Sequence, residues 1–200
     1  DLTVVCIDEN HFRIISAAAV RTHDKAHILK NLSLDIEFKD VTDDLICLGI
    51  FGPKSRNLMS KLSDDNFSNK KFKFGHSKNI KINNKKVWTQ RLSYVGELGY
   101  ELYIKINDAN EIYDLIINKG KEFNLSHCGA HAMDTMRMES GFLHWGHDIS
   151  PEENQFEANL EFAISFKKKF DFIGKEALIK LKHKKLKKRF AMFVLKENIP

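Results

Sequence analysis

The order of strand-like and helix-like segments is the feature that most constrains how this chain folds. Residues 77–82 and 85–93 have the residue pattern of strands, and only Asn83 and Asn84 separate them. Asparagine tolerates the positive φ angles of a two-residue turn, so these segments predict a β-hairpin. Pairs of strands followed by helices indicate an α+β fold with mainly antiparallel sheets and packed helices. The regular alternation that a doubly wound nucleotide-binding fold requires is not present.

The other segments fit the same organisation. Residues 2–7 and 11–17 predict a hairpin of their own. Pro53 suits the first turn of a helix, and Asp108 is placed to cap another. The remaining expected elements are strands at 36–41, 45–51, 100–106 and 190–195 and helices at 18–32, 109–123 and 130–140.

Composition restricts the class of protein. Hydrophobic residues make up 42% of the 200 residues, and the chain has only 10 Gly and 3 Pro. These values exclude disorder and collagen-like repeats, so we expect a sizeable core. No apolar run approaches the roughly 20 residues that cross a bilayer, so we expect no membrane partner. Because the sequence opens and closes on strand-like runs, we expect it to be a fragment of a longer chain.

Positive charge is concentrated near the C-terminus. Residues 167–189 contain eleven Lys or Arg and two acidic residues, so this segment carries +9 and the rest of the chain −4. A basic segment can bind nucleic acid through phosphate contacts, but here Lys outnumbers Arg and aromatic residues lie only at the edges. We therefore expect a solvated helix face and no nucleic-acid partner, with nucleic-acid binding as the alternative.

Cysteines and histidines give weak signals for metal or nucleophile chemistry. Three cysteines far apart exclude a disulfide framework and fit a reducing, cytoplasmic compartment. His23 and His27, like His127 and His131, have the spacing that brings two imidazoles onto one helical face. Neither pair comes with further ligands in a plausible pattern, so we expect no metal. Cys128 adjoins His127 only in sequence, which predicts a buried structural cysteine and not an activated nucleophile.

Residues 91–104 contain the strongest candidate for binding chemistry. Strand alternation places the apolar Tyr100, Leu102 and Ile104 on one face and Glu101 on the other. Two neighbouring glycines let the backbone approach closely, which leaves room beside the carboxylate for a flat ligand. The alternative is a surface glutamate on a half-exposed strand.

The stretch Tyr94-Val-Gly-Glu-Leu-Gly-Tyr-Glu101 closely resembles the YxGExGYE signature of the folate-binding aminomethyltransferase family, which includes the T protein of the glycine cleavage system. Within the family, the sequence is most similar to the dimethylglycine and sarcosine dehydrogenase branch. The resemblance covers essentially all 200 residues. Its further blocks, in the family's order, are 1–4, 132–141, 144–149, 155–160 with two changes, and 172–178.

The resemblance implies roles for individual residues. Asp1 matches the family's catalytic aspartate, which lies beside the reactive nitrogens of tetrahydrofolate. Glu101 matches the glutamate that holds the pteridine, where a carboxylate can accept parallel hydrogen bonds from the ring's amide and amino groups. Tyr94 matches a tyrosine at the folate. Phe142 and Trp145 match aromatic positions near it, with a role as core aromatics as the alternative.

One departure from the family pattern concerns the helix expected at 130–140. Met133 stands where the glycine-cleavage proteins have an arginine that contacts the folate, a change that resembles the dehydrogenase branch. Arg137 lies one turn away and becomes the candidate for folate contact. At this spacing an ion pair with Asp134 is the favoured alternative.

By resemblance, the expected reaction transfers a one-carbon unit from an aminomethyl or iminium donor to tetrahydrofolate, giving 5,10-methylenetetrahydrofolate, in glycine, sarcosine or dimethylglycine catabolism. Residues 1–165 would form the folate-binding domain without its N-terminal part. Residues 166–200 would form a basic helix and strand that lead to a C-terminal barrel domain. FAD is expected only if a flavin domain precedes Asp1, and a carrier protein is another possible partner. The alternative is a non-catalytic folate-binding regulator or scaffold.

Overall fold

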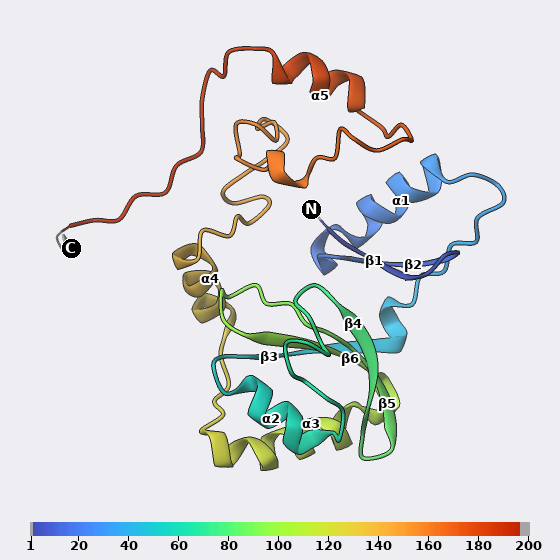
Figure 1. Cartoon of the computed structure of the whole chain (residues 1–200), viewed down its shortest axis with the longest axis vertical. Helices are drawn as coiled ribbons and strands as arrows, with labels where there is room; N and C mark the ends of the chain where they lie inside the picture. The colour runs from blue at the N-terminus through green and yellow to red at the C-terminus, as the bar shows by residue number, and fades with distance from the viewer. Residues whose placement is uncertain (1, 197–200) are drawn as a thin grey trace. The chain divides into compact units, whose positions relative to one another are not determined.

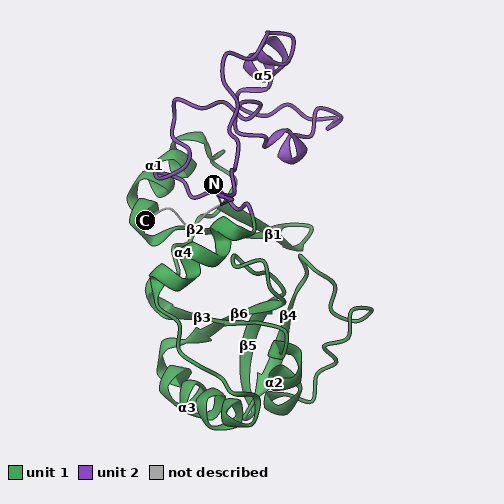
Figure 2. Cartoon of the chain, turned by 90° about the vertical axis from the view of Figure 1, so that its left-hand side faces the viewer, with its two compact units in different colours: residues 1–140 green, residues 141–200 purple. Residues whose placement is uncertain are grey.

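The computed structural model describes residues 2–196, so the predicted catalytic residue Asp1 lies outside the described residues. The chain divides into two compact units, Asp1–Ser140 and Gly141–Pro200. Figure 1 shows the elements in chain order, and Figure 2 colours the two units separately. All strands of the described residues lie in the first unit, so that unit positions the sheet residues of the candidate site.

The main sheet has four antiparallel strands. They are β3 (Leu45–Phe51), β4 (Ser77–Ile82), β5 (Lys85–Gln90) and β6 (Gly99–Lys105), in the spatial order β3-β6-β5-β4. The predicted hairpin joins β4 and β5, and its turn residues Asn83 and Asn84 have φ angles of 45° and 62°. β5 ends at Gln90, earlier than expected. The α+β fold with mainly antiparallel sheets is confirmed.

Two helices, α2 (Ser55–Leu62) and α3 (Ala109–Gly120), cover one face of the main sheet (Figure 1). This face carries Tyr100, Leu102 and Ile104, all completely buried, as the alternation predicts. The ring of Tyr100 packs against the rings of Phe67 and Phe72, with centroids 5.7 and 5.8 Å away. Because burying one such side chain contributes about 1.5–3 kcal/mol, this layer is the main source of stability in the first unit.

Asp108 occupies the N-cap position of α3 but makes no side-chain capping hydrogen bond. Its carboxylate instead lies 3.0 Å from Nζ of Lys85, at the start of β5. The helix begins where the sequence predicts, but the predicted side-chain cap is wrong. The ion pair ties the first turn of α3 to the hairpin of the main sheet.

A second sheet consists of the hairpin β1 (Leu2–Asp8) and β2 (His11–Ser16), which confirms the predicted pair of strands. The guanidinium of Arg13 lies 4.2 Å from the ring centroid of Trp88. Trp88 pairs with Tyr103 and therefore lies on the face of the main sheet that α2 and α3 leave open. The first hairpin thus contacts that second face.

The helix α1 (Arg21–Asn31) follows the first hairpin, but the strand expected at 36–41 is wrong. The backbone there is irregular, because polar contacts and not strand pairing hold it. Nη2 of Arg21 lies 3.0 Å from Oδ2 of Asp40 and 2.9 Å from Oδ2 of Asp43. Hydrogen bonds from Thr42, together with Arg21, hold the pKa of Asp40 well below its usual range.

The helix α4 (Ala130–Glu139) ends the first unit, and α5 (Lys175–Lys182) lies in the basic segment of the second. The strand expected at 190–195 is wrong, because this segment pairs with no other strand among the described residues. No helix in the described part of the chain is long and apolar enough to span a bilayer. The 3₁₀ turns of the described residues are Ala18–Val20, Thr42–Asp44, Ile106–Asp108, Lys121–Phe123 and Glu161–Ala163.

Candidate functional site

Glu101 lies in the middle of β6, opposite Gly49 of β3 and Gln90 of β5. Its side chain is half-buried on the second face of the main sheet. Tyr103, on the same strand and face, donates a hydrogen bond of 2.7 Å from Oη to Oε2 of Glu101. Burial and this hydrogen bond raise the pKa of Tyr103. The phenol therefore stays protonated at neutral pH and fixes the orientation of the carboxylate.

Gln90 is the cross-strand neighbour of Glu101 and is only 1% exposed. Its Oε1 atom has no hydrogen-bond partner among the described residues. A buried acceptor without a donor costs free energy, so this atom is suited to receive an N–H group of a ligand. Neither Gln90 nor Tyr103 stands out in the sequence alone. Strand register was the signal that could have found them, since it places all three side chains on one face.

Gly49 and Gly99 flank the ring of Phe51. A Cβ atom added at either glycine would overlap that ring, which explains why neither position carries a side chain. The glycines were predicted to leave room for a flat ligand, but the ring of Phe51 takes the space at Gly99. A ligand at Glu101 therefore has to approach from the β5 side, where Gln90 lies.

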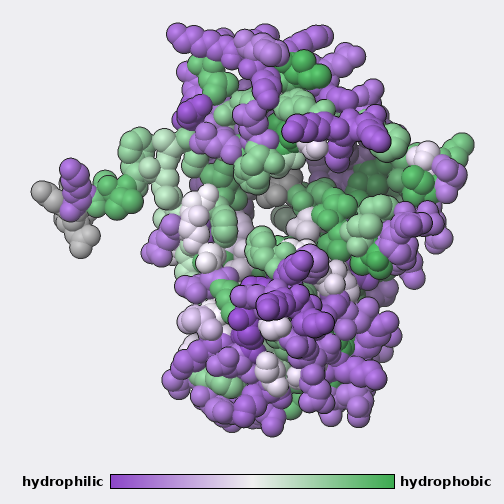
Figure 3. Space-filling view, in the orientation of Figure 1, coloured by the Kyte–Doolittle hydropathy of each residue, from purple (hydrophilic) through white to green (hydrophobic). Residues whose placement is uncertain are grey.

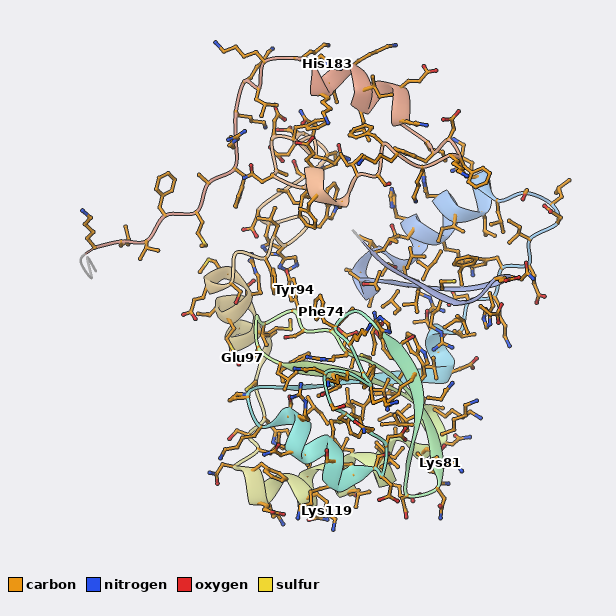
Figure 4. The ribbon with its side chains drawn as sticks, viewed as in Figure 1. Phe74, Lys81, Tyr94, Glu97, Lys119 and His183 are labelled. Atoms are coloured by element: carbon orange, nitrogen blue, oxygen red, sulfur yellow. The ribbon has the colours of Figure 1, made fainter. Side chains whose placement is uncertain are left out.

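The loop between β5 and β6 carries Tyr94 and Glu97, which Figure 4 labels. The loop is anchored where the carbonyl of Leu98 accepts a hydrogen bond of 3.0 Å from Oγ of Ser55. Tyr94 is half-buried, whereas Glu97 is exposed. Of the two glutamates in the motif, only Glu101 lies on the sheet, so Glu97 offers a natural control.

The end of α4 contacts this loop. A Cβ atom on Gly96, whose φ is 73°, would collide with the side chain of Ser140, and Oγ of Ser140 donates a hydrogen bond of 3.3 Å to the carbonyl of Val95. Arg137 of α4 is 4% exposed, and its Nε lies 2.7 Å from Oδ1 of Asp134. The favoured ion pair is confirmed, and contact between Arg137 and a ligand stays a prediction.

In the second unit, Trp145 and Phe142 are 42% and 40% exposed. The loop that carries Trp145 is closed by a hydrogen bond of 2.8 Å from the N–H of Gly146 to the carbonyl of Ile149. Gly146 has a φ of 86°, which glycine adopts without strain. Ile149 is buried while Trp145 faces outward. Neither aromatic residue is part of the core, and their contact with a folate stays a prediction.

The described residues contain no group of three or more His, Cys, Asp or Glu arranged to hold a metal ion. The paired histidines have other neighbours: Nδ1 of His23 lies 3.2 Å from Oδ1 of Asp24, and Nε2 of His127 lies 2.7 Å from Oη of Tyr113. Cys128 is exposed, so the expectation of a buried structural cysteine is wrong. It lies in an irregular segment before α4 and not in the core.

Comparison with known proteins identifies the family to which this chain belongs. The family model of the GCVT N-terminal domain matches residues 1–168. The chain therefore belongs to the GCVT N-terminal domain family. The resemblance drawn from the residues around Tyr94 and Glu101 is confirmed.

Individual proteins of known function are similar to this chain over nearly its whole length. Dimethylglycine dehydrogenase, mitochondrial, from Homo sapiens is 37% identical over 98% of this chain, which spans 23% of that protein. Aminomethyltransferase from Thermoanaerobacter sp. (strain X514) is 34% identical over 99% of this chain, which spans 54% of that protein. The crystal structure of glycine cleavage system aminomethyltransferase T from Bartonella henselae gives a TM-score of 0.74 at 20% identity, over 90% of this chain and 47% of its own. This structural match supports the fold alone.

Proposed function

We propose that this chain supplies the tetrahydrofolate-binding part of an enzyme that transfers a one-carbon unit. The donor is an aminomethyl or iminium compound from glycine, sarcosine or dimethylglycine catabolism, and the product is 5,10-methylenetetrahydrofolate. Family membership and the names of the relatives support the reaction class. Because the chain spans about a quarter of the dehydrogenase and about half of the transferase, the activity is proposed for the whole protein.

The observation that carries the proposal is the pair of acceptors formed by Glu101 and Gln90. The pteridine ring presents amide and amino N–H groups along one edge, and adjacent acceptors on one sheet face match that pattern. Tyr103 uses one acceptor position of Glu101, and a carboxylate has about four, so capacity remains for the ring. The orphaned Oε1 of Gln90 would gain a donor from the same ligand. The residues present therefore fit a bound folate.

Each proposed residue has a distinct role in the transfer. Glu101 and Gln90 bind and orient the ring, which removes much of the entropic cost of bringing two reactants together. Asp1, by its family match, stabilises developing positive charge and relays a proton at its carboxylate. Tyr94, Arg137, Phe142 and Trp145 complete the proposed binding set.

The cofactor and partner assignments follow the same proposal. Tetrahydrofolate and the one-carbon donor are the small-molecule partners, and FAD takes part only if a flavin domain precedes this chain. A carrier protein that delivers the one-carbon donor is the other proposed partner. The three cysteines fit a reducing compartment, which we propose to be the cytoplasm. The second candidate function is a non-catalytic folate-binding regulator, since the sheet acceptors account for binding without chemistry.

Replacement of Glu101 by alanine tests binding. We expect Glu101→Ala to weaken tetrahydrofolate affinity by about 1.5–3 kcal/mol, the usual contribution of hydrogen bonds to a charged group. Titration calorimetry on the full-length protein measures the change. Glu97→Ala is the matched control, because Glu97 belongs to the same motif but is exposed. Equal affinity of wild type and Glu101→Ala would remove the proposed site.

Replacement of Asp1 by asparagine separates the enzyme from the regulator. We expect Asp1→Asn to retain folate affinity within about tenfold, because the amide keeps the shape of the carboxylate. We expect transfer to slow by about 100-fold or more, because the negative charge and proton acceptor are lost. Single-turnover formation of 5,10-methylenetetrahydrofolate, with donor and folate saturating, measures the rate. A rate within a few-fold of wild type would favour the regulator.

A further inference from the structure

A pocket of about 430 Å³ opens on the second face of the main sheet, near the far end of β6 from the Tyr94 loop. This volume lies within the range of small-molecule sites. Trp88 and Tyr103 form part of its wall, with ring centroids 4.7 Å apart. The residues that line the pocket are Arg13, Leu45, Asn79, Asn84, Lys85, Lys86, Trp88, Tyr103, Lys105 and Asp108.

The charges that line this pocket are unequal. Arg13, Lys85, Lys86 and Lys105 contribute four cations, and Asp108 contributes the one carboxylate, so the lining carries a net charge of +3. Asp108 is already paired with Lys85 at 3.0 Å. Within residues 2–196, the other three cations of the lining form no ion pair. The pocket therefore presents an excess of positive charge to whatever enters it.

Arg13 shows that this charge is partly removed from water. Its guanidinium stacks on Trp88, and its Nη1 atom is buried without a hydrogen-bond partner in the described structure. Burial lowers the pKa of Arg13. A buried cationic donor without an acceptor costs free energy, which an oxyanion in the pocket would recover. The planar guanidinium suits a carboxylate or phosphate group that can accept two parallel hydrogen bonds.

We propose that this pocket binds a small multivalent oxyanion, a molecule with two or more carboxylate or phosphate groups. Arg13 receives one oxyanion group against the Trp88 wall. Lys86 and Lys105, on neighbouring strands at the rim, receive the other. Because Tyr103 lines the pocket and also holds Glu101, the anion lies next to the proposed folate site without using its acceptors.

The test is titration of the full-length protein with citrate, which carries three carboxylates, at low and high salt. We expect saturable binding that weakens as salt rises. Arg13→Gln and Lys105→Gln should each weaken it by about tenfold or more, since each removes a charged hydrogen-bond donor. Lys105 is exposed, so its replacement leaves the fold intact. Lys119→Gln, on α3 and outside the pocket, is the matched control for lost charge and should bind as wild type does (Figure 4).

Two sources of the oxyanion are distinguished by adding saturating tetrahydrofolate. If the affinity for citrate is unchanged, the pocket binds an anion separate from the folate. If tetrahydrofolate competes with citrate, and this competition is lost in Arg13→Gln, the pocket binds the carboxylates of the folate itself. Absence of saturable citrate binding would overturn the proposal. Equal loss of binding in the Lys119→Gln control would overturn it as well, because the effect would then reflect net charge alone. Neither result bears on Glu101, so failure here leaves the proposed function standing.

Discussion

The two sheets of the first unit contain similar residues but bury them very differently. In the main sheet, Tyr100, Leu102 and Ile104 are completely inaccessible beneath α2 and α3. In the first hairpin, five large apolar side chains remain between 39% and 58% exposed. Figure 3 shows green, hydrophobic side chains gathered over this part of the chain. These side chains are Leu2, Val4, Ile7, Phe12 and Ile14.

This difference shows that an apolar strand pattern predicts a strand but not its burial. The hairpin residues Thr3, Val5, Arg13 and Ile15 form the less exposed face, and Arg13 reaches Trp88 from it. The opposite face keeps Leu2, Val4, Phe12 and Ile14 at least 42% exposed in the described part of the chain. A two-stranded hairpin is marginal by itself, so its order depends on the face that contacts the main sheet.

The largest expected effect compares one aromatic side chain from each sheet. In the 200-residue chain, Tyr100→Ala should lower the free energy of unfolding by about 3–5 kcal/mol, because it opens a cavity beside Phe67 and Phe72. Phe12→Ala should change it by less than about 1 kcal/mol, because 56% of Phe12 is already exposed. Urea unfolding measures both values. Similar losses for the two variants would break the comparison and show that the hairpin face is covered in solution.

The sequence correctly predicted features that depend only on residues near one another in the chain. The turn at Asn83 and Asn84 requires positive φ angles, and the burial of alternate residues along β6 follows from strand geometry. The strand expected at 36–41 failed because its apolar pattern does not reveal that Arg21, 19 residues earlier, binds Asp40. The side-chain cap expected from Asp108 failed because Lys85 takes its carboxylate.

Only part of the candidate site could be predicted, because the rest depends on contacts between residues far apart in the chain. Glu101 could be chosen from the sequence, because strand alternation and the family motif both point to it. Gln90 and Tyr103 could not be chosen, because their importance depends on strand register and on which polar atoms are left without partners. The ring of Phe51, which fills the space at Gly99, also follows from pairing between distant segments.

A smaller effect is expected at the loop that carries Tyr94, which packs against the end of α4. The comparison is the turn at Gly75, where an added Cβ atom would meet no neighbour among the described residues. Gly96 and Gly75 have φ angles of 73° and 74°, but only at Gly96 would a Cβ atom meet a neighbour, Ser140. Gly75→Ala should cost about 1–2 kcal/mol from backbone strain alone. Gly96→Ala should cost about 1–3 kcal/mol more, because the side chain of Ser140 must also shift. Urea unfolding of both variants isolates the packing term, and equal losses would mean that the loop and helix separate readily.

The smallest expected effect concerns the hydroxyl group of Tyr100, and it sharpens the contrast between buried and exposed positions. Oη of Tyr100 is buried without a hydrogen-bond partner in the described structure, whereas Oη of Tyr113 lies 2.7 Å from His127 at an exposed position. Tyr100→Phe keeps the ring packing and removes a polar atom whose desolvation is uncompensated. It should leave the free energy of unfolding unchanged or raise it by up to about 1 kcal/mol. Tyr113→Phe loses an existing hydrogen bond and should lower the free energy of unfolding by about 0.5–1 kcal/mol.

The urea midpoints of the two variants should therefore move in opposite directions or differ clearly. A destabilised Tyr100→Phe would show that the hydroxyl is hydrogen-bonded in solution, and the stability of the main sheet would then include a polar contribution beside its apolar core.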